Sequence, residues 1–163
     1  MTDSAPTPFS HLDRQGRASM VDVSTKAITR RVARASCRVR LADETVDRLS
    51  DLPKGDAVAV ARLAGVQAAK RTDALIPLAH SLPLDRVEVE IVPCAGGVRI
   101  ESEVVATART GAEMEALVAC STAALALYDM VKAVEKGAVI EALRLEAKSG
   151  GRSGDWVRTD DAR

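Results

Sequence analysis

The sequence predicts an α+β domain in which two helices cover one face of a four-stranded antiparallel sheet. Several stretches alternate between apolar and polar side chains, as a strand with one buried face does. Two longer alanine-rich stretches carry apolar residues at helical spacing. Along the chain the order is strand, helix, two strands joined by a tight turn, helix and strand. With 163 residues, the chain has the length of one such domain with short tails.

The first strand is expected over residues 33–41, "ARASCRVRL", where small or apolar residues alternate with arginine and serine. A short helix is expected over 43–49. The next helix should begin at Asp56, whose carboxylate can accept hydrogen bonds from the free amides of the first turn. Its buried side is predicted to hold Val58, Ala61, Val66 and Ala69.

The second and third strands are expected over 85–93 and 98–110, with the turn "CAGG" between them. The longest helix is predicted from Ala112 to Val134, directly after Gly111, and a final strand near 139–147. This β-α-β-β-α-β order is that of the split βαβ, or ferredoxin-like, sandwich.

Three segments make up the predicted domain organisation. Residues 1–18 are polar, contain two prolines and are expected to form a flexible arm. Residues 19–148 are expected to form the single folded domain. Residues 149–163 are rich in glycine and charge, so we expect a flexible segment that acts either as an active-site lid or as a plain tail.

Composition argues against several functional classes. The net charge is zero and only 2% of residues are aromatic, which disfavours nucleic-acid binding. The three cysteines are widely spaced and there are only two histidines, so neither a disulfide framework nor a transition-metal site is expected. We find no signal peptide and no segment long enough to span a membrane, which predicts a cytoplasmic protein. A net charge near zero favours a defined oligomer.

The longest helix carries an unusual polar face. Its sheet-facing side should hold Leu117, Cys120, Ala124, Leu127 and Val131. The opposite side holds Glu115, Ala119, Thr122, Ala126 and Asp129, with Lys132 at its edge. This side is either a solvated face with an incidental ion pair, or a strip of small residues that a ligand or another helix approaches. Glu115 and Asp129 should lie roughly 21 Å apart along the axis. A site using both would therefore be shared between antiparallel helices of two copies.

Other candidate groups are basic. His80 lies in a proline-rich loop just after Lys70 and Arg71, which suggests a phosphate pocket, although a lone histidine is more often structural. Lys54 precedes a helix amino terminus, where free amides attract anions. Lys148 and Arg152 lie in "KSGGRSGDW", which lacks the spacing of a P-loop but could close over an anionic ligand.

Five stretches, in this order, resemble the cyclic pyranopterin monophosphate synthase family of molybdenum-cofactor biosynthesis. They are "MVDVS" from 20, "AAKRTDALIPLAHSLPL" from 68, "TGAEMEAL" from 110, "YDMVKAV" from 128 and "KSGGRSGDW" from 148. The resemblance covers nearly all of residues 9–157. It implies a ferredoxin-like fold and a homohexamer built as a trimer of dimers, with sites between subunits. It also implies conversion of 3′,8-cyclo-7,8-dihydro-GTP to the cyclic pyranopterin, with loss of pyrophosphate.

The resemblance also assigns roles to residues. Asp129 and Lys132 match the catalytic aspartate and lysine, and Lys54 matches a lysine at the start of the first long helix. The substrate-binding positions match Leu78, Ala79, His80, Glu113, Met114 and Glu115. The loop commonly reads Leu-Cys-His-Pro, whereas this chain has Ala79 and Ser81 at the second and fourth positions. We take the missing thiol as dispensable, because the acid and base groups remain.

These assignments suggest a mechanism. The triphosphate would be held by Lys54, Lys70, Arg71, His80, Lys148 and Arg152. Lys132 would be the general acid, held by Asp129, and its pKa would have to fall from about 10.4 through burial or neighbouring cations. Glu113 or Glu115 would contact the guanine-derived amino and NH groups.

No organic cofactor or metal site is expected, because the conversion is a rearrangement with phosphate displacement. A magnesium ion accompanying the triphosphate is compatible with the sequence but not required by it. Two rival functions stay open at this point. One is a non-catalytic ferredoxin-like module for ligand binding or assembly, and the other is a phosphohydrolase that attacks ordinary GTP. Pyrophosphate release from the cyclic nucleotide discriminates between these functions.

Overall fold

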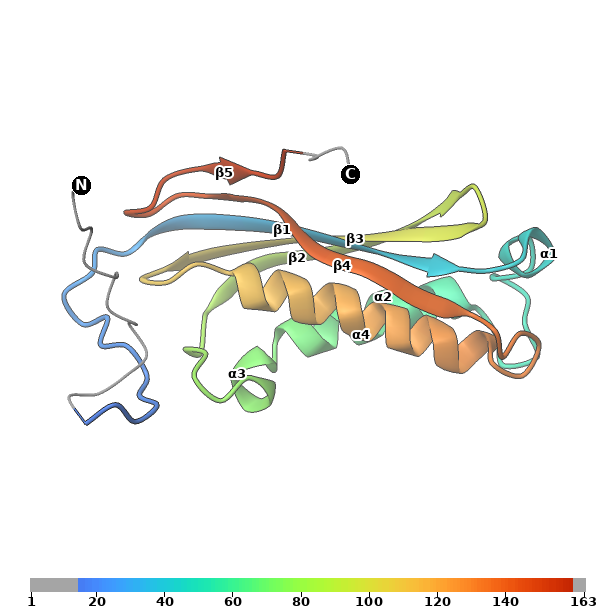
Figure 1. The fold of residues 1–163 in the computed structure, drawn as a ribbon, viewed down its shortest axis with the longest axis horizontal. Helices are drawn as coiled ribbons and strands as arrows, with labels where there is room; N and C mark the ends of the chain where they lie inside the picture. The colour runs from blue at the N-terminus through green and yellow to red at the C-terminus, as the bar shows by residue number, and fades with distance from the viewer. Residues whose placement is uncertain (1–14, 160–163) are drawn as a thin grey trace, which may run out of the picture.

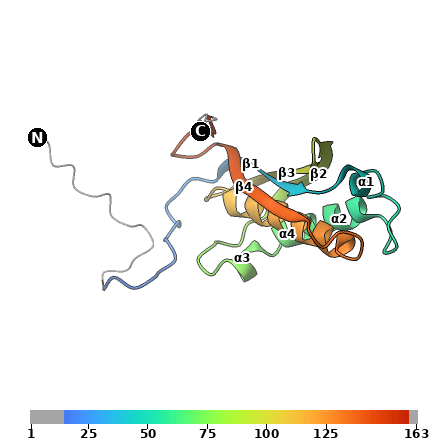
Figure 2. The ribbon, with the colours of Figure 1, turned by 45° about the vertical axis from the view of Figure 1, so that its right-hand side comes forward.

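The computed structural model describes residues 15–159, which form an antiparallel sheet with helices on one face. Figure 1 shows the sheet as one layer and the two long helices as a second layer beneath it, and Figure 2 shows the same layers from another side. The elements in chain order are β1 (Thr29–Arg40), α1 (Asp43–Val46), α2 (Ala57–Ala69), α3 (Thr72–Leu75), β2 (Leu84–Cys94), β3 (Gly97–Ala108), α4 (Glu113–Val131), β4 (Val139–Ser149) and β5 (Trp156–Val157).

The strand order is β2-β3-β1-β4-β5, and every pair is antiparallel. The first four strands have the order of the ferredoxin-like sandwich, so the predicted fold class is confirmed. β5 was not predicted. It pairs with the edge of the sheet through Ala147↔Val157 and Lys148↔Trp156. The predicted arm, 1–18, falls largely outside the described residues, and a lid role for 149–163 stays a prediction.

Local chemistry explains where α2 begins. The Asp56 carboxylate accepts a hydrogen bond from the backbone N–H of Ala59 at 2.9 Å, which is the predicted amino-terminal cap. Of the four residues predicted on the buried side, Ala61 and Ala69 are fully buried and the two valines are partly buried.

Alanine in α4 allows the two long helices to pack very closely. An added Cβ at Gly65 of α2 would lie 2.8 Å from the carbonyl oxygen of Ala119 and 3.2 Å from the Cβ of Ala123. Ala119, which we predicted on the open side of the helix, is fully buried. At Ala119 the strip of small residues is therefore approached by another helix, α2 of the same chain, which is one of the alternatives left open by the sequence. The placement of Ala119 on the open side was wrong.

α4 also differs from the sequence prediction in its length and in being long and apolar enough to cross a membrane. It ends at Val131, three residues before the predicted end, so Lys132 is its carboxyl-terminal cap. By length and composition its 19 residues are long and apolar enough to cross a membrane, contrary to our prediction that no such segment exists. Ten of these residues are buried, and the helix packs on β1, β3, β4 and α2. α4 is therefore a core helix of this domain.

Candidate active site

The predicted site residues form two groups at opposite ends of α4. The carboxyl-end cluster consists of Lys54, Asp129 and Lys132. The amino-end site consists of two adjoining cavities around residues 110–115. Glu115 and Asp129 are separated by about 21 Å of helix, from a rise of 1.5 Å per residue. A single chain therefore holds the two groups apart.

In the carboxyl-end cluster, one carboxylate lies between two lysines. The Nζ of Lys132 lies 2.6 Å from Oδ1 of Asp129, and the Nζ of Lys54 lies 3.0 Å from Oδ2. Lys54 also donates to the carbonyl oxygen of Asp129 at 2.8 Å. The tight turn before α2 presents Lys54, and its Gly55 has φ of +99°. The structure thus confirms the contact between Asp129 and Lys132 and adds to it Lys54, which the sequence singled out separately.

The ion pairs determine the protonation of this cluster. The pKa of Asp129 is lowered, first by the hydrogen bond from Lys132 and then by that from Lys54. The pKa of Lys132 is raised by the same contact with Asp129. The sequence prediction required the opposite shift for Lys132. It fails in the isolated chain because the side chains of Lys132 and Asp129 are 51% and 56% exposed, so burial does not oppose the attraction.

The smaller cavity of the amino-end site has a volume of about 270 Å³. His80 and Glu115 line it, together with Val21, Val23, Lys26, Ala79, Leu82, Thr110, Gly111 and Met114. The Nε2 of His80 lies 2.8 Å from the carbonyl oxygen of Val21, so this nitrogen carries the proton and donates. His80 thereby ties its loop to the "MVDVS" segment and leaves Nδ1 for other contacts. Leu78 does not line this cavity.

Glu115 is the buried acid of the smaller cavity. It is only 3% exposed, and burial raises its pKa to about 7, with Glu113 and Asp73 adding smaller repulsions. The side chain was predicted on the same open face as Asp129, yet it is enclosed. A carboxyl group with this pKa changes protonation near neutral pH.

The larger cavity adjoins the smaller one and has a volume of about 760 Å³. The two cavities share Lys26, Thr110 and Gly111. Its charged lining comprises Lys26, Arg31, Arg109, Lys148, Arg152 and Glu113. The Nζ of Lys148 lies 3.3 Å from Oε1 of Glu113 and 3.0 Å from Oγ of Ser153. With five cations and one carboxylate, this cavity is suited to a multiply charged anion.

Arg31 is built into the wall of the larger cavity. It is 9% exposed and donates to the carbonyl oxygens of Gly150 and Arg109, each at 3.3 Å. An added Cβ at Gly151 would lie 1.5 Å from its Nη1, and Gly151 has φ of +78°. The glycine-rich loop therefore packs against β1 through this guanidinium.

Sequence reasoning missed three of the cations in this lining. The predicted first strand began at residue 33, which left Arg31 outside it, although β1 begins at Thr29. Lys26 follows the quoted "MVDVS" stretch by two positions, and Arg109 lies at the end of the third strand. All three lie close to the end of a strand, and this shared position could have identified them from the sequence.

Three predicted phosphate ligands lie outside both cavities, and one of them, Lys54, belongs to the carboxyl-end cluster. Lys70 and Arg71 are exposed at the junction of α2 and α3. Within residues 15–159 their side chains line neither cavity and form no ion pair with a carboxylate. In the same part of the chain, no three His, Cys, Asp or Glu side chains gather as metal ligands would.

Comparison with known proteins identifies the family. A sequence model of the MoaC family matches residues 20–151. A cyclic pyranopterin monophosphate synthase of Streptomyces griseus is 52% identical over 158 residues, which is 96% of this chain and 89% of the relative. The synthase of Herpetosiphon aurantiacus is 54% identical, over 91% of this chain and 93% of the relative. The synthase of a Nostoc species is also 54% identical, over 91% of this chain and 90% of the relative. This chain therefore belongs to the MoaC family.

Proposed function

We propose that this protein is a cyclic pyranopterin monophosphate synthase, a lyase of molybdenum-cofactor biosynthesis. It converts 3′,8-cyclo-7,8-dihydro-GTP into the cyclic pyranopterin and releases pyrophosphate. Family membership supports the reaction. The structural observation that carries the proposal is a strongly basic cavity directly adjoining a smaller one that holds a buried carboxyl group and a histidine. A nucleotide-derived substrate has the same two parts, a triphosphate and a nitrogen-rich ring.

We place the triphosphate in the larger cavity. Guanidinium groups bind phosphate oxygens through two parallel hydrogen bonds, and lysines add point charges. Arg31 is already held by two carbonyl groups, so it loses little freedom when it binds. Lys148 is held in β4, between β1 and β5, and Arg152 comes from the glycine-rich loop, so the two cations reach the cavity from different elements.

The ring is placed in the smaller cavity, against Glu115. An ionised carboxylate accepts two hydrogen bonds at once, which matches an amino group beside a ring NH. Because burial raises the pKa of Glu115 to about 7, this acceptor is fully available only above neutral pH. His80 and Met114 line the same cavity and would position the ring.

The catalytic pair would come from a second copy of the chain. Asp129 and Lys132 lie too far along α4 to reach a ring bound at Glu115 of the same chain. We therefore propose a homohexamer, built as a trimer of dimers, in which the carboxyl-end cluster of one copy closes the amino-end site of another. Lys70 and Arg71 would reach substrate only through such an assembly.

Lys132 is proposed as the general acid that protonates a leaving nitrogen, with Asp129 holding it in position. In the separate chain the ion pair keeps this lysine protonated. Enclosure by a neighbouring copy would remove water from the ammonium group and shift its pKa downward, which makes proton donation easier.

Further properties are part of this proposal. We propose that no organic cofactor is required, and that magnesium, when present, arrives with the triphosphate. We also propose a cytoplasmic location. Activity that survives dialysis against a chelator would support the absence of a tightly bound metal. Cell fractionation tests the cytoplasmic location.

The reaction itself is tested by incubating purified protein with the cyclic nucleotide and, separately, with GTP. We expect stoichiometric pyrophosphate from the cyclic nucleotide and none from GTP. Phosphate or pyrophosphate release from GTP would instead identify a phosphohydrolase. No release from either substrate by folded protein would reject a synthase.

A further inference from the structure

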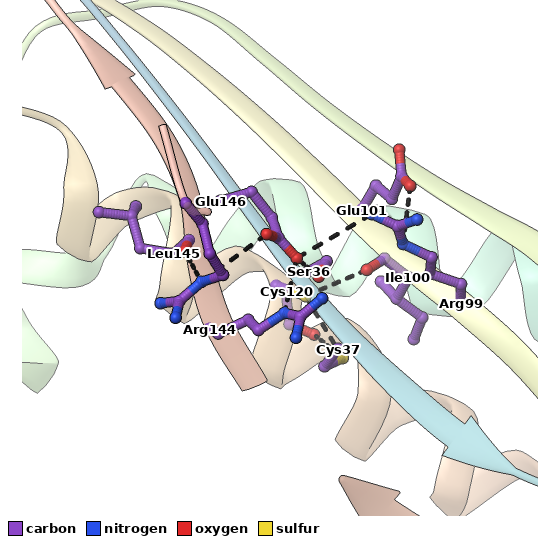
Figure 3. Close-up of polar contacts among 10 residues, drawn as sticks. Ser36, Cys37, Arg99, Ile100, Glu101, Cys120, Arg144, Leu145 and Glu146 are labelled. Atoms are coloured by element: carbon purple, nitrogen blue, oxygen red, sulfur yellow. Dashed lines mark hydrogen bonds and ion pairs between the residues drawn. The ribbon is translucent and has the colours of Figure 1, made fainter. Parts of the chain in front are cut away.

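Two thiols meet in the core between β1 and α4. Cys37 is 2% exposed and Cys120 is fully buried, and their sulfur atoms lie 3.3 Å apart (Figure 3). The third cysteine, Cys94, is exposed at the end of β2. The pair links a central strand of the sheet to the middle of the helix that carries both halves of the proposed site.

Hydrogen bonds make the two thiols chemically different. The Sγ of Cys120 donates to the Sγ of Cys37, with the carbonyl oxygen of Ile100 as a second acceptor at 3.5 Å. This contact lowers the pKa of Cys37 and raises that of Cys120. Cys37 is therefore the thiol that ionises first, and the thiolate is the nucleophilic form of cysteine.

An irregularity in the sheet lies at Cys37, whose side chain points to the helix side. Along β1, Ser36 pairs with Arg144 and Arg38 pairs with Glu141, so Cys37 has no partner on β4. The extra residues of β4 form a bulge in which Ala142 has φ of +54°. At this point a cavity of about 240 Å³ opens, lined by Ser36, Cys37, Arg38, Cys94, Arg99, Ala142 and Arg144. Water occupies about 30 Å³, so a small oxidant fits.

The mouth of this cavity is rich in cations. Arg38, Arg99 and Arg144 all line it, and each also contacts a carboxylate. Figure 3 shows Arg99 and Arg144 both reaching toward Glu146. Arg38 and Arg99 lie on the face of the sheet opposite to the Cys37 side chain, so the contact that lowers the pKa of Cys37 is the one with Cys120. The site thus combines two thiols in contact with a break in the strand pairing and a cavity at the same residue.

We propose that Cys37 and Cys120 are a redox-modification site, which hydrogen peroxide converts into an intramolecular disulfide. The Cys37 thiolate attacks one peroxide oxygen and the O–O bond breaks. The second oxygen leaves as hydroxide and takes up the proton that Cys37 had lost, forming water. Cys120 then attacks the resulting sulfenic acid, the S–O bond breaks, and the Cys120 proton leaves with that oxygen as a second water. Two electrons pass from the sulfurs to the peroxide.

Only a small movement is needed to form this bond. The sulfur atoms must approach from 3.3 Å to the disulfide length of about 2.05 Å. The product would join the middle of α4 to β1 across 83 positions of sequence. In a reducing compartment such a bond is transient and regulatory rather than structural.

The test exposes the full-length protein to hydrogen peroxide, then alkylates it in denaturant and maps its peptides without reduction. We expect one alkylated thiol of the three, a mass lower by two hydrogen atoms before alkylation, and a Cys37–Cys120 cross-linked peptide that dithiothreitol removes. The variant Cys94→Ser should form the same cross-link. Three alkylated thiols, or oxidation confined to Cys94, would overturn the proposal.

The order of attack is tested with Cys120→Ala, a mild change in an alanine-rich helix. In this variant Cys37 should accumulate as sulfenic acid that dimedone traps, whereas Cys37→Ala should leave Cys120 unreacted at the same peroxide dose. Trapping at Cys120 but not at Cys37 would reverse the assigned roles. If Cys37→Ala fails to fold, peptide mapping of the wild-type chain still decides whether the disulfide forms. These readouts do not depend on synthase activity.

Discussion

Lys132 and Asp129 form a 2.6 Å ion pair one turn apart at the end of α4, while the other oxygen of the same carboxylate accepts from Lys54. Each of these three side chains is more than 40% exposed. An exposed ion pair contributes little to stability. These ion pairs therefore add little to the stability of the chain, so the proposed role of the three residues is best tested by catalysis.

Replacing Lys132 tests its role as proton donor. We expect Lys132→Ala to lower kcat by about 10²- to 10⁴-fold, the usual worth of general acid catalysis, and to change substrate Kd little. Single-turnover assays and calorimetric binding would measure the two effects. The control is Lys136→Ala, an exposed lysine four positions further along the chain, which should retain activity. An active Lys132→Ala enzyme would remove this lysine from the mechanism.

Mixing two inactive variants tests whether the site is shared. Asp129→Asn lacks a working carboxyl-end cluster, and Glu115→Gln lacks the ring acceptor of the amino-end site. Random assembly of equal amounts would pair an intact cluster with an intact amino-end site in about a quarter of all shared sites. We expect activity to recover to about that fraction after co-refolding. No recovery in assemblies shown to be mixed would argue that each chain works alone.

The buried carboxyl group of Glu115 should make stability depend on pH. Its pKa rises from 4.5 to about 7 on folding, so between these values the folded chain keeps a proton that the unfolded chain has lost. The free energy of unfolding therefore falls as the pH rises from about 4.5 to 7, by about 3 kcal/mol in total. Glu115→Gln should be more stable than wild type at pH 8, and this advantage should fade toward pH 5.

Urea unfolding across that pH range measures the difference. The exposed variant Glu44→Gln serves as a matched control and should reproduce the wild-type pH dependence. Parallel stability curves for wild type and Glu115→Gln would show that the carboxyl group is not perturbed by burial.

Alanine substitutions at two glycines of one loop distinguish the effect of a clash with Arg31 from the effect of backbone strain. Gly151 and Gly154 both have positive φ, at +78° and +66°, but an added Cβ meets Arg31 only at Gly151. Gly151→Ala should displace the guanidinium and weaken substrate binding by about 10- to 100-fold, the worth of a charged hydrogen bond. Gly154→Ala carries similar strain without the clash and should bind nearly as well as wild type. An equal loss of substrate affinity in the two variants would show that Arg31 does not bind the phosphate.

Local patterns in the chain were enough to predict the elements that form the fold. Alternation located β1, because each residue from Ala33 to Leu41 on its apolar side is buried, and the Asp56 cap located α2. These signals are readable because they depend on neighbours within a few positions. The same reasoning misjudged α4, since alanine suits both a solvated face and a tight helix contact. Only the position of Gly65 shows which one applies.

The sequence by itself therefore determined the sheet, the covering helices and the reactive residue types. Tertiary structure alone decided which of these residues meet. It placed Lys54 on Asp129 across 75 positions of sequence and Arg31 on Gly150 across 119. It left Lys70 and Arg71 outside both cavities. The physical reason is that local propensity acts over one or two turns, whereas a binding site is assembled by long-range packing, whose contacts no local pattern encodes.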